Sequence, residues 1–218
     1  MATSRTLAAG QTRARDRLHR PLTVLWATCL VVGLFLVGSF AYGMWRGVSE
    51  QRHLNQVWQT QVAPHPIVSK AIDPSLERPV GGVDFAIEVP KLNYFAAVKE
   101  GVDLGVLYSA PGHYPQTQWP GNAGTVGVAA HNVYWINFPQ LTKGDEIDLR
   151  TRYGLYRYRV TGSAIVDPND RSVLVPDASG FHLTLTTCWP LWAGAFATKR
   201  YVIFAEQFWP APLAPGYG

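Results

Sequence analysis

The sequence predicts a small all-β domain, either a barrel or a sandwich, that follows a helix long enough to cross a membrane. Two observations carry this prediction. Seven short segments with the alternation or β-branched content of strands are separated by Gly and Pro turn signals. They cover residues 85–89, 94–98, 124–130, 146–150, 156–166, 182–187 and 200–204. An uncharged apolar run lies upstream of all of them. With 218 residues, 47% of them hydrophobic, the chain can form one domain with a core and an anchor.

The apolar run spans residues 21–45, which contain no Asp, Glu, Lys or Arg. A helix of about 20 residues crosses the hydrocarbon core of a bilayer, so this run is long enough. Arginines before it predict a cytoplasmic N-terminus, with the following domain outside the cell, and Trp26, Tyr42 and Trp45 are placed to lie near the interfaces. A cleaved signal peptide is the alternative. However, the run exceeds the usual apolar core of about 7–15 residues and no A-x-A-like site follows it, which favours a retained anchor.

The net charge of +4 does not indicate a nucleic-acid surface. Five of the 19 basic residues lie in the first twenty positions, and the others are scattered. Residues 46–62 favour a helix that continues the anchor or packs on a surface, and the Pro and Gly content of residues 63–82 predicts a linker. The predicted organisation is a basic N-terminus (1–20), a membrane helix (21–45), a juxtamembrane helix and linker (46–82), a β-domain (83–208) and a Pro/Gly-rich tail (209–218).

The two cysteines differ in their predicted roles. Cys29 lies in the middle of the apolar run and far from Cys188, so a disulfide between them is implausible. Cys188 is then a lone thiol in an exported domain, at the end of a strand and just before Trp189 and Pro190. An inert buried cysteine is the alternative, but the strand-end position favours a reactive one.

A thiol attacks an acyl group as the thiolate, so it needs a proton acceptor or a cation nearby. His131 ends the apolar strand over residues 124–130 and is the favoured partner, while His113 lies in a Pro/Gly-rich loop that predicts a groove contact or a solvated turn. His182 is on the same strand as Cys188, roughly 20 Å away along the chain. Arg200 begins the next strand, and strand alternation places it and Lys199 on opposite faces.

The segment Thr184-Leu185-Thr186-Thr187-Cys188, followed by Arg200 twelve residues later, resembles the signature of the sortases, which are bacterial cysteine transpeptidases. His131 matches the third element of the family, in an Ala-His-Asn sequence where the family often has Gly-His-Arg. The resemblance covers residues 83–206. It implies a closed eight-stranded β-barrel with short helices, of class D or E type, with Cys188, His131 and Arg200 as catalytic residues.

The resemblance also implies the reaction. The enzyme would cleave a C-terminal sorting signal similar to Leu-Pro-x-Thr-Gly, or Leu-Ala-x-Thr-Gly, between Thr and Gly, and transfer the acyl group to an amine. Its partners would be surface proteins that carry the signal, a peptidoglycan precursor or a pilin amine as acceptor, and the membrane, without nucleic acid. Thr187, Trp189 and His113 are the candidate peptide contacts.

Two other functions fit the same residues. A Cys–His hydrolase would release the acyl group to water, and a non-catalytic β-domain would bind envelope peptide or glycan without turnover. No cofactor is predicted. Some sortases bind calcium through loop carboxylates, but Asp167, Asp170 and Asp177 lack a recognisable ligand spacing.

Overall fold

The computed structural model describes residues 6–62, 74–174 and 180–210. The chain divides into two compact units, Met1–Arg46 and Gly47–Gly218. Helix α1, Thr6–Val57, begins in the first unit and ends in the second. The predicted continuation of the apolar helix beyond residue 45 is therefore confirmed.

The first unit exposes large apolar side chains along α1. Trp26, Phe35 and Phe40 are all exposed, and the most apolar stretch of 18 residues has a mean hydropathy of 2.2 with none of it buried in the protein. Water solvates such an apolar surface poorly, whereas the apolar interior of a bilayer accommodates it. By length and composition, this helix is able to cross a membrane.

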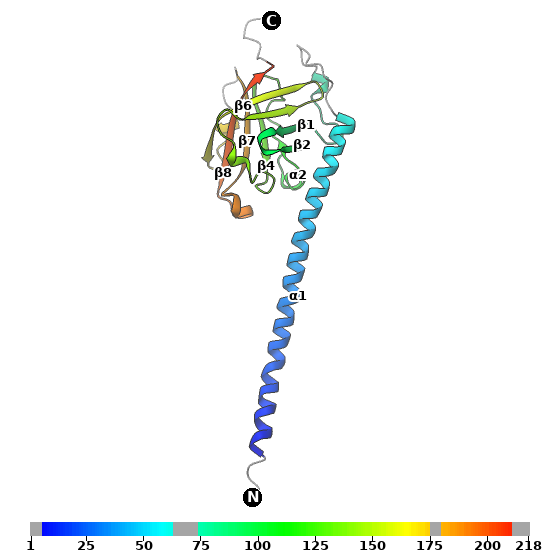
Figure 1. Ribbon diagram of the computed structural model, residues 1–218, viewed down its shortest axis with the longest axis vertical. Helices are drawn as coiled ribbons and strands as arrows, with labels where there is room; N and C mark the ends of the chain where they lie inside the picture. Colours follow the sequence, from blue (N-terminus) through cyan, green and yellow to red (C-terminus); the bar gives the residue numbers. More distant parts are fainter. Residues whose placement is uncertain (1–5, 63–73, 175–179, 211–218) are drawn as a thin grey trace. The chain divides into compact units, whose positions relative to one another are not determined.

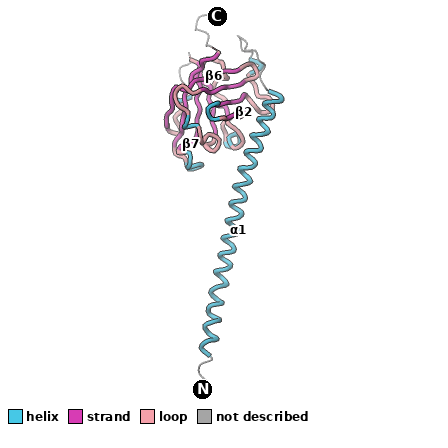
Figure 2. The backbone as a smooth tube through the Cα atoms, viewed as in Figure 1, coloured by secondary structure: helices cyan, strands magenta, loops and turns pink. Residues whose placement is uncertain are grey.

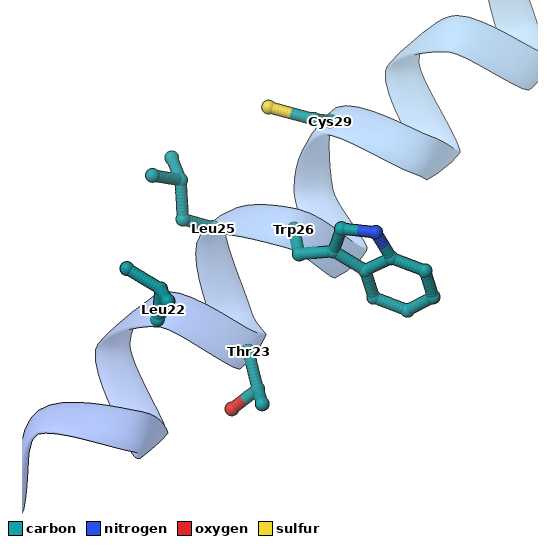
Figure 3. Close-up of a pocket in the computed structure, with 5 residues that line it drawn as sticks. All are labelled: Leu22, Thr23, Leu25, Trp26 and Cys29. Carbon is teal, nitrogen blue, oxygen red and sulfur yellow. The ribbon is translucent and has the colours of Figure 1, made fainter.

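A shallow hollow on the first unit lies on α1 alone. Figure 3 shows its lining, Leu22, Thr23, Leu25, Trp26 and Cys29, with no residue from another element. Leu22, Leu25 and Cys29 project to the same side because they are spaced by three and four residues. Cys29 is a free thiol on this apolar face, in agreement with the prediction that it forms no disulfide with Cys188.

The second unit contains a closed eight-stranded barrel, as predicted (Figure 2). Its strand order is β1-β2-β3-β4-β7-β8-β6-β5. The strands are β1 Phe85–Val89, β2 Tyr94–Glu100, β3 Gly112–His113, β4 Gly124–Ala130, β5 Glu146–Arg150, β6 Leu155–Val166, β7 Phe181–Trp189 and β8 Lys199–Trp209. The pairs β2–β3 and β4–β7 are parallel, and the others are antiparallel. Closure leaves few unpaired edges.

Short helices join the strands. They are η1 Trp58–Val62, a π-helical turn; the 3-10 helices η2 Pro74–Leu76, η3 Pro90–Leu92, η4 Phe138–Gln140, η5 Ser172–Leu174 and η6 Leu191–Phe196; and α2 Leu104–Leu107. The Asp103 carboxylate caps α2 by accepting from the amides of Gly105 and Val106. Because these turns join the strands, the ends of the barrel consist of irregular segments, whose side chains can contact a ligand.

The sequence missed one strand. Strand β3 lies inside the segment 108–122, for which a loop was expected, and it pairs with Lys99 of β2 and Val128 of β4. Two residues between prolines carry no alternation pattern, so only the neighbouring strands define it. Most of the predicted linker (63–73) and most of the predicted tail (211–218) lie outside the described residues.

The end of α1 packs on the outside of the barrel. Leu54, Val57, Trp58 and Val62 form a buried cluster with Val83, Ala86, Ala97 and Ala110. Ala86 and Ala97 pair across β1 and β2, and their small side chains let the helix approach the sheet. Leu54 and Trp58 share one buried face because they are four residues apart on the helix.

A hydrogen bond completes this contact. The Ala97 amide donates to Asn55 Oδ1 at 2.8 Å, and Gln51 Nε2 donates to the same oxygen at 2.8 Å. Strand β3 begins to pair with β2 only at Lys99, so the Ala97 amide has no strand partner on that side. The helix supplies the acceptor that a third strand would otherwise provide.

We expect Trp58→Ala to lower the free energy of unfolding of the second unit by about 3 to 5 kcal/mol, because it leaves a large cavity between helix and barrel. Urea unfolding of the full chain in detergent micelles measures the change. Thr60→Ala, at an exposed position of the same turn, is the control and should change it by less than about 0.5 kcal/mol. Equal effects of the two substitutions would show that the packed helix does not stabilise the barrel.

Candidate active site

Cys188 and Arg200 lie opposite each other on neighbouring strands. In the antiparallel pair β7–β8, the register joins Cys188 to Arg200 and Trp189 to Lys199. The thiol and the guanidinium therefore occupy facing ends of two paired strands. Strand β7 continues one residue beyond Cys188, to Trp189, which is further than the sequence indicated.

His131 follows the last paired residue of the parallel strands β4 and β7. That pair joins Ala130 to Thr187, so the next residue on each strand is His131 on one and Cys188 on the other. Neighbouring strands lie about 4.8 Å apart. The backbones that carry the imidazole and the thiol are thus adjacent.

The three side chains share one face of the sheet. On each strand, side chains that belong to the core alternate with side chains of this face. The core side chains are Leu183 and Leu185 on β7, Val128 and Ala130 on β4, and Ile203 and Ala205 on β8. Because alternate residues of a strand point to opposite faces, Cys188 and Arg200 point away from the core, and the same period extended one residue beyond β4 applies to His131. Thiol, imidazole and guanidinium therefore stand side by side on the outer face of three adjacent strands.

The strand ends are held in register by Thr187. Its hydroxyl donates to the carbonyl of Ala130 at 2.9 Å, and the side chain is buried on the face opposite Cys188. Thr187 is therefore a brace between β4 and β7. This corrects the expectation that it contacts peptide.

Partial burial lowers the pKa of His131 below that of an ordinary histidine, because desolvation penalises the charged imidazolium. The lowered pKa favours the neutral ring, which is able to accept a proton. Among the residues that the structure describes, neither ring nitrogen forms a hydrogen bond. The imidazole is therefore free to face the thiol or a substrate.

Arg200 is half-buried, and its guanidinium donates to the carbonyl of Lys199 at 3.1 Å. Lys199, on the opposite face, pairs with Asp167 at 3.4 Å. Within the described part of the chain, Arg200 has no carboxylate partner. Its positive charge is thus available for a negative group that arrives at the site.

A groove of about 310 Å³ opens beside Arg200. It is lined by residues from the end of β6 and the β6–β7 connection, from the segments after β2 and β3, and from the outer faces of β7 and β8. They are Val102, Tyr114, Gln116, Val166, Pro168, Asn169, Asp170, Arg171, Val173, Leu174, Thr186, Arg200 and Val202. The groove lies on the same face as Cys188, because Thr186 precedes the thiol by two residues on β7.

A pair of hydroxyls crosses the groove. Tyr114 Oη lies 3.0 Å from Thr186 Oγ1, which joins the segment after β3 to β7. Gly127 of β4 lies beneath them, where a Cβ would approach the side chains of Tyr114 and Thr117 at 3.0 Å. The groove therefore has a narrow polar floor, with hydroxyls able to bond the backbone of an extended peptide.

The other two candidate peptide contacts do not line this groove. The Trp189 ring is half-buried and packs against Tyr201, with ring centres 5.5 Å apart, on the face opposite Cys188. His113 is 2% exposed; its Nδ1 lies 2.9 Å from Asp84 Oδ2 and its Nε2 lies 3.0 Å from the carbonyl of Gln118. A solvated turn was expected there, and that expectation is wrong because both ring nitrogens are engaged inside the protein.

One residue of the site escaped the sequence analysis. Asn132 follows His131, is buried, and donates from Nδ2 to the carbonyl of Leu191, which opens η6 just after Cys188. It ties the segment after the imidazole to the segment after the thiol. Its place beside His131 was visible in the sequence, but its partner 59 residues away was not.

The segment after the thiol is helical. In η6 it makes two short helical turns across a kink at Gly194, whose φ is 53°. Among the described residues, no group of three or more His, Cys, Asp or Glu side chains is arranged to hold a metal ion. Asp177 lies outside those residues.

We expect the His131 imidazole to titrate below its usual pKa of about 6.5, because partial burial favours the neutral ring. NMR chemical shifts of the ¹³Cε1 nucleus, followed against pH in the full chain, report the midpoint, and His131→Gln identifies the signal. A midpoint above 6.5 would contradict the expectation and indicate a neighbouring negative charge.

Three comparisons with known proteins identify the family and the fold. The Sortase domain family model matches residues 87–208. Sortase D of Bacillus subtilis (strain 168) is 30% identical over 134 residues, which cover 61% of this chain and 68% of the relative.

Solved structures show the same fold. A Clostridium perfringens Sortase D5 transpeptidase superposes with a TM-score of 0.57 at 22% identity, over 73% of this chain and 96% of that one. Sortase E of Streptomyces avermitilis superposes with a TM-score of 0.51 at 29% identity, over 60% and 90%. The family model matches more than half of the chain and covers the strands that carry the thiol, the imidazole and the guanidinium, and we conclude that this chain belongs to the sortase family of cysteine transpeptidases.

Proposed function

We propose that the protein is a membrane-anchored transpeptidase that cleaves a sorting signal through an acyl-thioester on Cys188. The observation that carries the proposal is the shared outer face of β4, β7 and β8, where the register sets His131, Cys188 and Arg200 side by side. A nucleophile, a base and a cation are the groups that acyl transfer needs, and the cation, Arg200, also lines the groove.

In the first half-reaction, Cys188 Sγ attacks the carbonyl carbon of the scissile bond while the thiol proton passes to His131. The carbonyl oxygen becomes negatively charged, and Arg200 stabilises that charge. His131 then gives its proton to the departing amine nitrogen, the carbon–nitrogen bond breaks, and the carbonyl re-forms as a thioester. A neutral His131 in the free enzyme suits its role as the first proton acceptor.

In the second half-reaction, an incoming amine attacks the thioester carbon and loses a proton to His131. The carbon–sulfur bond breaks, and His131 returns the proton to the Cys188 sulfur. The product is a new amide bond, and the enzyme is regenerated. Transfer to water by the same steps would make the protein a hydrolase, so the acceptor must be determined by experiment.

The 310 Å³ groove beside Arg200 is the proposed site for the residues that precede the scissile bond. Val166, Val173 and Leu174 offer apolar contacts for a leucine, and the hydroxyls of Tyr114 and Thr186 offer hydrogen bonds to the peptide backbone. This lining fits a signal of the type Leu-Pro-x-Thr-Gly or Leu-Ala-x-Thr-Gly.

The apolar segment of α1 is the proposed anchor, with the N-terminus in the cytoplasm and the barrel outside the cell. Anchoring would hold the enzyme where exported proteins emerge. One solved relative is a pilus-related sortase C of Group B Streptococcus, which supports a pilin amine as one class of acceptor beside a peptidoglycan precursor.

The decisive experiment incubates the full chain, in detergent micelles, with labelled Leu-Pro-x-Thr-Gly and Leu-Ala-x-Thr-Gly peptides, with and without an added amine. We expect mass spectrometry to find an acyl adduct on Cys188 that passes to the amine and is absent from Cys188→Ala. Cys29→Ala is the matched control and should form the adduct as before, because Cys29 lies on the anchor helix. An adduct that forms but passes only to water would identify a hydrolase.

A second experiment tests Arg200 against its neighbour. We expect Arg200→Gln to lower kcat/KM by about 10²- to 10³-fold, as when one donor to a developing oxyanion is removed. Lys199→Gln, on the opposite face, is the control and should change kcat/KM only slightly. Equal losses in the two variants would indicate a general effect of charge on peptide binding rather than a contact with the reacting carbonyl.

A further inference from the structure

Exposed apolar side chains gather at one end of the barrel. Among the described residues of the second unit, nine large apolar side chains are exposed, and six of them lie in three segments at this end. These segments are α2 with its C-cap residue, residues 133–136 after β4, and η6 after β7. The six side chains, here called the apolar rim, are Leu104, Tyr108, Val133, Ile136, Trp192 and Phe196.

The two aromatic residues of η6 are the most exposed of the six. Trp192 is 87% exposed and Phe196 is 88% exposed. Exposed patches of this kind usually mark a binding surface, because a large aromatic ring has a lower free energy when it is buried than when it is in water. η6 and the other rim segments, residues 104–108 and 131–137, contain no Asp, Glu, Lys or Arg. The rim is therefore both apolar and uncharged.

Hydrogen bonds join the three segments into one surface. Asn132 Nδ2 donates to the carbonyl of Leu191 in η6, and Tyr134 Oη donates to the carbonyl of Tyr108 at 2.7 Å. The rim is thus built on a connected framework and not on three independent loops.

The same framework contacts Gly47, the first residue of the second unit. Gly47 is buried so closely against it that a Cβ there would lie 2.9 Å from the Tyr108 carbonyl and 3.0 Å from Tyr134 Oη. In the sequence, only Arg46 separates Gly47 from the uncharged apolar run that ends at Trp45. The rim therefore lies at the end of the barrel to which the proposed anchor is covalently joined.

We propose that the apolar rim docks on the outer leaflet of the membrane, with Trp192 and Phe196 inserted at the level of the lipid headgroups. Tryptophan and other amphipathic or aromatic side chains favour this layer. The inference rests on the proposed anchor and adds a second membrane contact made by the barrel itself. Because two of the three rim segments, residues 133–136 and η6, closely follow His131 and Cys188, docking would bring the active-site end of the barrel to the membrane surface.

Electron paramagnetic resonance of the full chain in nanodiscs tests the proposal. The discs contain equal parts of phosphatidylethanolamine and phosphatidylglycerol and one protein each. In a Cys29→Ala/Cys188→Ala background, a nitroxide is attached after Trp192→Cys, Phe196→Cys or Trp209→Cys. Trp209 is the matched control, an exposed tryptophan at the other end of β8, about 33 Å along the strand from Lys199 (Figure 1).

We expect labels at positions 192 and 196 to collide several-fold more with oxygen, relative to a water-soluble nickel complex, than the label at 209. A water-like ratio at 192 and 196, equal to that at 209, would overturn the proposal. Shielding from both agents at the rim, with dipolar broadening once several copies share a disc, would assign the rim to self-association instead and would also overturn it.

A label after Leu34→Cys separates this inference from the anchor on which it rests. Leu34 is exposed in the middle of the apolar run. A lipid-like ratio at 34 with a water-like ratio at 192 would keep the anchor and reject the docking surface. A water-like ratio at 34 would reject the anchor itself. Both variants at the rim replace highly exposed side chains, so neither should prevent folding.

Discussion

The in-register parallel pairing of β4 with β7 is the interaction on which the rest of the site depends. Seven residue pairs, from Gly124 with Phe181 to Ala130 with Thr187, bring a base from one part of the chain beside a thiol nearly sixty residues later. A slip of one residue would turn the whole outer face of one strand into the core. Buried leucines and valines on the inner face, and the Thr187 hydroxyl on the Ala130 carbonyl, oppose such a slip.

The barrel separates two tasks between the faces of the same strands. The inner face of β7 provides Leu183 and Leu185 to the core, and its outer face provides Thr186 to the groove and carries Cys188 two residues further on. Chemistry can therefore vary on the outside without loss of packing inside. The irregular segments that follow the strands add side-chain contacts that the sheet itself cannot supply. Asn132 connects the two segments that leave the site, so the imidazole and the region after the thiol share one support.

Much of this arrangement could be predicted from the sequence, and the limits have physical causes. Alternation and β-branched content identified seven of the eight strands, and they placed Cys188 at the end of one strand and Arg200 at the start of the next. Strand β3 has no pattern of its own because two residues cannot alternate. The burial of His113 was missed for a related reason. Its neighbours Gly112 and Pro115 are typical of turns, while its partner Asp84 lies 29 residues earlier. Contacts between distant segments, such as Asn132 with Leu191, leave no local signal.

The Ala97 amide, satisfied by Asn55 rather than by a strand, has a consequence for how the protein can be divided. A fragment that begins at residue 83, the predicted start of the β-domain, would lack Asn55, Leu54 and Trp58. Val83, Ala86, Ala97 and Ala110 would then face water, next to a backbone amide in need of an acceptor. Such an edge is a template for pairing with another chain. We therefore expect the smallest fragment of the barrel that stays soluble and monomeric to begin within the helix and not at the first strand.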